Sequence, residues 1–176
     1  TYHEDSDKFS LSPEQAAVFA RENEPTCIQG LMQGVVGPFV KEDVAIDVFK
    51  TGRGRPWGEH HECCFCGTER FFRPAYAGHL LDEWIPAMTG VEEKLKMGAK
   101  VADIGCGLGT SSMLMAEQYP NSTIHAFDFH EPSIEEAKKR AEEKGLSNLE
   151  FFVSDAAAIP NESYDLACIF DAWHDM

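Results

Sequence analysis

The chain has 176 residues and a formal net charge of −15, and 43% of its residues are hydrophobic. This apolar content supports a folded core and excludes global disorder, which requires low hydrophobicity together with high charge. Because a strongly acidic chain repels a phosphate backbone, we expect no nucleic acid partner. The apolar runs are too short for a membrane span. The six cysteines do not resemble a secreted disulfide framework, which favours a cytoplasmic location.

The first part of the chain, residues 1–95, is expected to form a mostly helical N-terminal or lid region. Residues 1–10 are polar, and we expect them to fray. The run Ser12-Pro13-Glu14-Gln15 is typical of a helix start, with a capping serine, an early proline and a glutamine three residues on. Residues 51–67 are rich in glycine and are expected to form a loop, and residues 71–95 are again expected to be helical.

The second part, residues 96–176, alternates strands and helices. Short apolar runs predict strands over 101–104, 123–129, 149–153 and 165–170. The segments between the first three of these strands predict helices over 111–119 and 132–144. Such strand–helix units form right-handed crossovers in a parallel sheet. The fold class is therefore α/β, with a partial Rossmann-like parallel sheet preceded by the helical region.

A glycine-rich loop gives the sharpest signal in the sequence. The run Asp103-Ile104-Gly105-Cys106-Gly107-Leu108-Gly109-Thr110 follows a predicted strand and opens a predicted helix. Glycines there allow a tight turn and let backbone N–H groups approach a ligand at the start of the helix. Glycine loops also serve as simple turns, so the loop needs support from other positions.

Acidic residues provide that support, because they follow the ends of the later strands. Asp128 ends the second strand, Asp155 follows the third and Asp171 follows the fourth. Ligands bind at the carboxyl ends of strands in such sheets, and an acid at the second strand can bond ribose hydroxyls. A nicotinamide dehydrogenase is one alternative, but its G-x-G-x-x-G pattern is not met, since position 110 is threonine.

The pattern Asp103-x-Gly105-x-Gly107-x-Gly109 resembles motif I of class I S-adenosylmethionine-dependent methyltransferases. The resemblance implies strand order 3-2-1-4, S-adenosyl-L-methionine as the cofactor and S-adenosyl-L-homocysteine as the product. It implies that Asp128 binds the ribose, that Phe129 lies beside the adenine, and that residues 154–156 form the adenine-binding turn. The implied cofactor site comprises Asp103, Gly105, Gly107, Gly109, Asp128, Phe129, Asp155, Ala156 and Phe170.

Residues 68–74, 83–87 and 173–176 resemble a methyltransferase subgroup often labelled as transcriptional regulators, whose members carry a winged-helix-like N-terminal region. Compared with that pattern, the chain stops after strand four. We therefore expect this chain alone to be inactive, and either to self-associate through strand four, giving a homodimer, or to derive from a longer polypeptide. The alternative to an enzyme is a non-catalytic S-adenosylmethionine-binding module or sensor linked to transcriptional regulation.

The acceptor is expected to be a small molecule, and His174 and Asp171 are the candidate catalytic residues because they follow strand four. His174 is either a general base or an orienting residue.

Two further groups of side chains have a functional and a structural interpretation. The cluster His60–Cys66 contains one C-x-x-C pair, but a zinc site normally needs a second pair, so we predict no metal. The aromatic residues Tyr76, His79 and Trp84 line an acceptor pocket or cover the cofactor in one interpretation, and pack as core in the favoured one.

Overall fold

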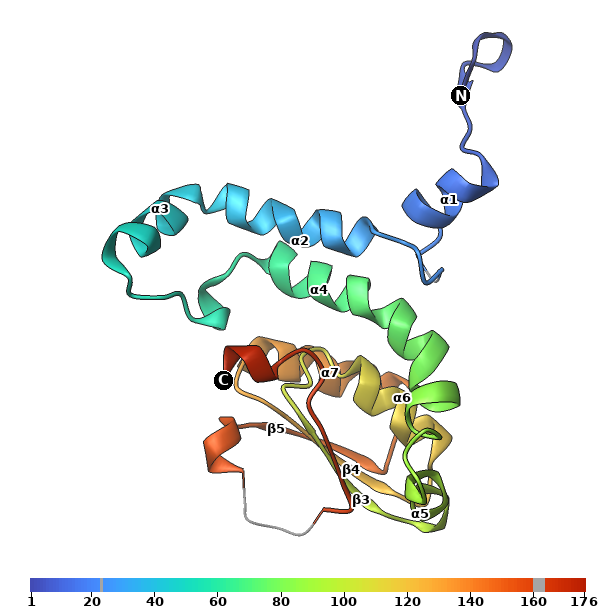
Figure 1. Cartoon of the computed structure of the whole chain (residues 1–176), viewed down its shortest axis with the longest axis vertical. Coiled ribbons are helices and arrows are strands. Elements are labelled where there is room, and N and C mark those ends of the chain that lie inside the picture. The colour runs from blue at the N-terminus through green and yellow to red at the C-terminus, as the bar shows by residue number, and fades with distance from the viewer. Residues whose placement is uncertain (23, 160–163) are drawn as a thin grey trace. The chain divides into compact units, whose positions relative to one another are not determined.

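The computed structural model describes residues 1–22, 24–159 and 164–176 (Figure 1). The chain divides into two compact units, Thr1–Pro74 and Ala75–Met176. The segment 75–95 groups with the second unit. The domain boundary that we expect after residue 95 stays a prediction.

The first unit contains a small hairpin followed by helices. Its elements are β1 (Tyr2–His3), η1 (Glu4–Ser6), β2 (Lys8–Phe9), α1 (Pro13–Phe19), α2 (Gln29–Val40), α3 (Glu42–Thr51), η2 (Trp57–Glu59) and α4 (Glu62–Ala75). The predicted start of α1 is confirmed, since the Ser12 Oγ accepts a hydrogen bond from the Gln15 amide at 3.2 Å and the Gln15 side chain accepts from the Ser12 amide at 3.0 Å. The region is mostly helical, as expected.

Two local predictions for this unit were wrong. Residues 1–10 are not frayed, because β1 and β2 pair antiparallel and the Tyr2 hydroxyl donates to the Asp7 carboxylate at 2.9 Å. Residues 62–67 belong to α4 rather than to a loop. Gly67 there has a structural reason: a side chain at this position would lie 2.3 Å from the Gly34 amide nitrogen of α2, so the glycine lets two helix backbones pack in direct contact.

The second unit begins with a π-helix and continues as a strand–helix alternation. Its elements are η3 (Tyr76–Trp84), α5 (Val91–Met97), β3 (Lys100–Ile104), α6 (Thr110–Gln118), β4 (Thr123–Asp128), α7 (Glu131–Glu143), β5 (Leu149–Val153), η4 (Ala156–Ala158), β6 (Leu166–Cys168) and η5 (Trp173–Asp175). The four strands of this unit pair in parallel in the order β5-β4-β3-β6. In order of appearance this is 3-2-1-4, so the predicted α/β topology is confirmed.

The core of this unit lies against the sheet. Val101 of β3 and Ile124 of β4 are fully buried, and they belong to one apolar cluster with Ile134 of α7 and Met115 of α6. Helices α6 and α7 both pack on β4 and β5. Because the four strands are parallel, their carboxyl ends lie on the same side of the sheet, and so do the helix starts that follow them. Within the described residues, no helix has both the length and the apolar character needed to cross a bilayer.

Candidate functional site

The glycine loop joins β3 to α6 and is held by backbone hydrogen bonds. The amides of Gly105 and Cys106 both donate to the carbonyl of Phe127, at 2.8 and 3.0 Å, and so tie the loop to the end of β4. The Gly109 amide donates to the Cys106 carbonyl at 2.9 Å. These bonds give the loop a defined shape before any ligand arrives. A Cβ at Gly107 would have nothing within 4 Å, so a bound group can approach the backbone there.

Asp103 lies beneath this loop at the end of β3 and is 1% exposed. Its Oδ2 accepts from the hydroxyls of Ser111 and Ser112, at 2.7 and 2.6 Å, both in the first turn of α6. Its Oδ1 has no hydrogen-bond partner among the described residues. Burial raises the pKa of this carboxyl, against the lowering effect of the two serine hydroxyls, and the nearby Asp128 raises the pKa further. A buried oxygen without a donor is costly unless a ligand supplies one.

Asp128 ends β4 and faces the loop from the neighbouring strand. Its Oδ2 accepts from the Gly107 amide and its Oδ1 accepts from the His130 amide, both at 2.8 Å. The side chain is 8% exposed. Each carboxylate oxygen can accept more than one hydrogen bond, so these contacts leave capacity for ribose hydroxyls. Its role in binding ribose stays a prediction, and so do the ligand-binding roles of the other predicted residues.

The residues expected near the adenine follow the carboxyl ends of two neighbouring strands, β4 and β5. Phe129 directly follows β4 and is 55% exposed. Asp155 follows β5, and its Oδ1 accepts from the Ala157 amide at 2.8 Å, so it caps the short helix η4 that begins with Ala156. Both Asp155 and Ala156 are exposed. Phe129 and Ala156 thus present apolar surface that a flat ring can cover.

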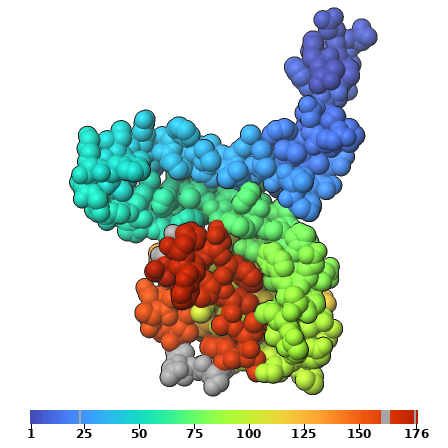
Figure 2. Space-filling view, viewed as in Figure 1, coloured from blue at the N-terminus to red at the C-terminus, as the bar shows by residue number. Residues whose placement is uncertain are grey.

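The predicted acceptor-side residues follow β6. Asp171 is a non-glycine residue in the left-handed region, with φ of 52°. Its Oδ1 lies 3.7 Å from the Nδ1 of His174, and both side chains are largely exposed, at 48% and 64%. The segment after β6 lies at the surface of the second unit (Figure 2). The pair is therefore a weak, solvent-exposed contact, which can orient His174 but does not hold it rigidly.

Two features of this site were not predicted from the sequence. Ser111 and Ser112 hold Asp103, and the signal for them is their position one turn after the glycine loop. The ring of Tyr76 lies 5.4 Å from that of Phe170, which brings the π-helix to the residues after β6. Tyr76 and Phe170 both pack against the apolar core, as the favoured structural interpretation expects, whereas Trp84 is 40% exposed.

The cysteines behave as thiols in this structure. Burial raises the pKa of Cys106 well above its usual range, and burial together with Asp103 raises the pKa of Cys168 to about 12. Both stay protonated near neutral pH. Within the described residues, His, Cys, Asp and Glu side chains form no group of three that could hold a metal ion. The prediction of no metal at His60–Cys66 stays a prediction.

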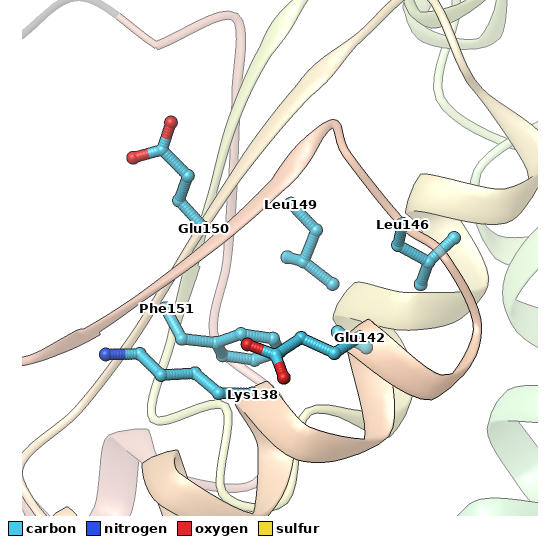
Figure 3. A pocket seen from close by; sticks show the side chains of 7 residues that line it. Lys138, Glu142, Leu146, Leu149, Glu150 and Phe151 are labelled. Carbon is cyan, nitrogen blue, oxygen red and sulfur yellow. The ribbon is translucent and has the colours of Figure 1, made fainter.

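A separate surface hollow lies between α7 and β5 (Figure 3). Figure 3 shows Lys138 and Glu142 of α7 beside Phe151 of β5. None of the predicted site residues lines it. Three charged residues, Lys138, Glu142 and Glu150, line it, and no polar groups converge inside, so it lacks the features of a binding site.

Comparison with known proteins addresses the same part of the chain. Residues 95–176 match a methyltransferase domain. A tRNA (guanine-N(7)-)-methyltransferase of Edwardsiella ictaluri is 33% identical over 111 residues, which cover 53% of this chain and 46% of that protein. Aklanonic acid methyltransferase DauC of a Streptomyces species is 40% identical over 72 residues, covering 39% of this chain and 33% of that protein. The chain thus spans less than half the length of these curated relatives.

Among solved structures, PKMT2 of Rickettsia typhi in complex with AdoHcy aligns with a TM-score of 0.40 and 30% identity, covering 43% of this chain and 15% of that one. The segment that matches the methyltransferase domain, residues 95–176, includes the glycine loop, the buried Asp103 and Asp128, and all four parallel strands. The methyltransferase resemblance of residues 96–176 is thereby supported at the level of the domain. The subgroup and the nature of the first unit are not addressed by this match.

Proposed function

We propose that the second unit binds S-adenosyl-L-methionine and takes part in methyl transfer to a small-molecule acceptor. The observation that carries the proposal is the buried Asp103, whose Oδ1 has no partner among the described residues, beneath a glycine loop that is itself bonded to Asp128. The donor offers an ammonium group, ribose hydroxyls and an adenine amine, which match such acceptors. The match of residues 95–176 to a methyltransferase domain supports the same chemistry.

The residues present fit this cofactor. Asp103 Oδ1 can accept from the ammonium group, Asp128 can accept from the ribose, and Phe129 and Ala156 can contact the two faces of the adenine. Gly107 leaves space for close approach. When bound, S-adenosylmethionine supplies a methyl group on a sulfonium, which is a good leaving group. The protein then needs mainly to align the acceptor, so a general base is optional.

The charge of the chain bears on the acceptor. One relative is named for tRNA and another for a small molecule, aklanonic acid. A net charge of −15 disfavours a polyanionic acceptor, so we propose a small molecule. We assign Asp171 and His174 to the acceptor side. This assignment predicts that His174→Gln leaves the affinity for the donor within about twofold of wild type, whereas a loss above tenfold would reassign His174 to the cofactor site.

Calorimetric titration of the chain with S-adenosylmethionine and S-adenosylhomocysteine tests the proposal. We expect both to bind, and we expect Asp128→Ala to weaken binding by about 1–3 kcal/mol through the lost hydrogen bonds. Glu150→Ala is the matched control, because Glu150 is exposed on β5 and lies outside the predicted site. Absence of heat at millimolar ligand with a folded sample would refute the proposal. Heat with NAD instead would favour the dehydrogenase.

The broader assignments are proposals of the same kind. The subgroup labelled as transcriptional regulators, with a winged-helix-like first unit, is inferred from residues 68–74, 83–87 and 173–176. A cytoplasmic location is inferred from the cysteine pattern, and a homodimer from the apolar character of the fourth strand. Sedimentation of the purified chain measures the oligomeric state directly.

A further inference from the structure

The π-helix η3, Tyr76–Trp84, is the least common element of the fold. The Ile85 amide donates to the Leu80 carbonyl at 3.0 Å, five residues back, which is the spacing of a π-helix. Such helices are rare and occur frequently at functional sites. Leu80 and Ile85 are each 1% exposed and anchor the segment in the core. Tyr76 also packs against the core, whereas Trp84 is 40% exposed.

Two aromatic rings of this segment meet a third from the end of β6. The rings of Tyr76 and Trp84 are 6.2 Å apart and nearly perpendicular, at 85°. The ring of Phe170 lies 5.4 Å from Tyr76 and 6.3 Å from Trp84. These three residues form what we call the ring cluster. At these separations the three rings pack on one another, and the ring of His79 stacks on that of Trp84 at 6.2 Å. A cation would therefore contact the ring surface that this packing leaves uncovered, where an aromatic face attracts it more strongly than a neutral group.

The charges around the ring cluster favour a cation as well. Asp103 and Asp171 act on the Tyr76 phenol, and together with burial, the larger cause, they raise its pKa. No Lys or Arg occurs in the described segments 76–84, 105–109 and 164–176. Within residues 75–176 the basic side chains lie on α5, at the first residue of β3, and on α7 or the residue after it: Lys94, Lys96, Lys100, Lys138, Lys139, Arg140 and Lys144. No lysine or arginine of these segments therefore balances the carboxylates near the rings, and the basic group beside Asp171 is the His174 imidazole, at 3.7 Å.

The unpartnered Oδ1 of Asp103 is a second indication of a ligand, and the charge of Asp103 acts on the Tyr76 phenol of the ring cluster. The carboxyl is almost completely buried, and its other oxygen is used by the two serines of α6. A ligand with a donor for Asp103 and a cationic centre for the rings would satisfy both features at once.

We propose that the ring cluster binds the sulfonium centre of S-adenosylmethionine through the faces of Tyr76, Trp84 and Phe170, and so distinguishes the charged methyl donor from its neutral thioether product. The inference rests on the proposed function, since it assigns residues to the same cofactor. Ring faces attract a cation but offer a thioether only dispersion contacts. The ring cluster thus favours binding of the donor over retention of the product.

The test compares the affinities of the chain for S-adenosylmethionine and S-adenosylhomocysteine by calorimetry. Trp84→Leu and Tyr76→Leu each remove an aromatic face while keeping apolar volume. We expect each to weaken S-adenosylmethionine binding by about 3- to 30-fold and S-adenosylhomocysteine binding by less than about twofold. Tyr76→Phe is the matched control, because it keeps the ring, and it should preserve the wild-type ratio. Far-UV circular dichroism checks that each variant is folded.

The outcomes separate this inference from the function on which it rests. Suppose that both ligands bind the wild-type chain, and that the leucine variants either weaken both affinities equally or leave both unchanged. The ring cluster then does not recognise the sulfonium, and the inference is overturned while the cofactor assignment stands. If neither ligand binds the wild-type chain, the proposed function fails and the inference fails with it. Trp84 is partly exposed, so its variant tests the idea even if Tyr76→Leu unfolds the chain.

Discussion

Two glycines of the loop, Gly107 and Gly109, allow a matched test of how the loop is built. Both have positive φ, 53° and 76°. A Cβ at Gly109 would lie 2.7 Å from two ring carbons of Phe151 and 3.2 Å from the Cβ of Ala137. A Cβ at Gly107 would meet nothing within 4 Å. The two substitutions to alanine therefore share the backbone strain and differ in packing.

The magnitudes follow from these contacts. The left-handed conformation costs alanine roughly 1–2 kcal/mol, and the reduced freedom of the unfolded chain offsets roughly 0.4–1 kcal/mol of that. Gly107→Ala should thus lower the free energy of unfolding by about 1 kcal/mol. Overpacking against the ring of Phe151 adds roughly 1–3 kcal/mol at Gly109. Because the strain and the offset are common to both variants, the difference between them reports the packing alone.

Urea unfolding followed by far-UV circular dichroism measures the two free energies. Amide hydrogen exchange, read by mass spectrometry over β3 and β4, shows whether the loss is local to the second unit. We expect Gly109→Ala to be the less stable variant by roughly 1–3 kcal/mol. Equal stabilities within roughly 0.5 kcal/mol, or a larger loss for Gly107→Ala, would refute the contact between Gly109 and the core.

Three further outcomes are expected. Gly67→Ala should destabilise the first unit by about 3 kcal/mol, because its Cβ would lie 2.3 Å from the Gly34 amide nitrogen. Gly34→Ala should be neutral or stabilise α2 by up to about 1 kcal/mol, because the nearest atoms to its Cβ lie at 4.0 Å. Thermal unfolding compares the two variants. Burial raises the pKa of Asp103, so the folded state holds its proton to higher pH than the unfolded state, and stability is lost as pH rises through the folded pKa. The free energy of unfolding of Asp103→Asn, measured in urea, should accordingly rise relative to that of wild type as the pH increases above the usual range of an aspartate. A pH-independent difference between the two would contradict the raised pKa. Iodoacetamide should modify the exposed Cys66 of the native chain quickly. It should modify Cys106 only after unfolding, because that thiol is buried and its pKa is raised. Equal modification rates of the two cysteines, measured by peptide mass spectrometry, would contradict the burial of Cys106.

The sequence by itself determined the α/β topology of the second unit. The glycine loop, the proline and glycine stops and the apolar runs are local signals, and the observed helices α6 and α7 each begin one residue before the predicted starts. The strand order 3-2-1-4 came from the resemblance and agrees with the pairing of the four strands. Local signals suffice here because parallel strands with short crossovers leave few alternative topologies.

The tertiary structure alone decided the contacts between segments distant in the sequence. The sequence pattern predicts a loop at Gly67, whereas the structure shows that this glycine packs against Gly34 of another helix. The sequence around Gly67 does not show this packing, because it depends on the position of the second helix. Tyr76 and Phe170 are far apart along the chain, and no periodicity predicts that their rings lie 5.4 Å from each other. The pattern of residue types along a chain reports local conformation and burial, whereas the partner of each side chain depends on how complete elements pack. That packing brings the ring of Tyr76 to the ring of Phe170.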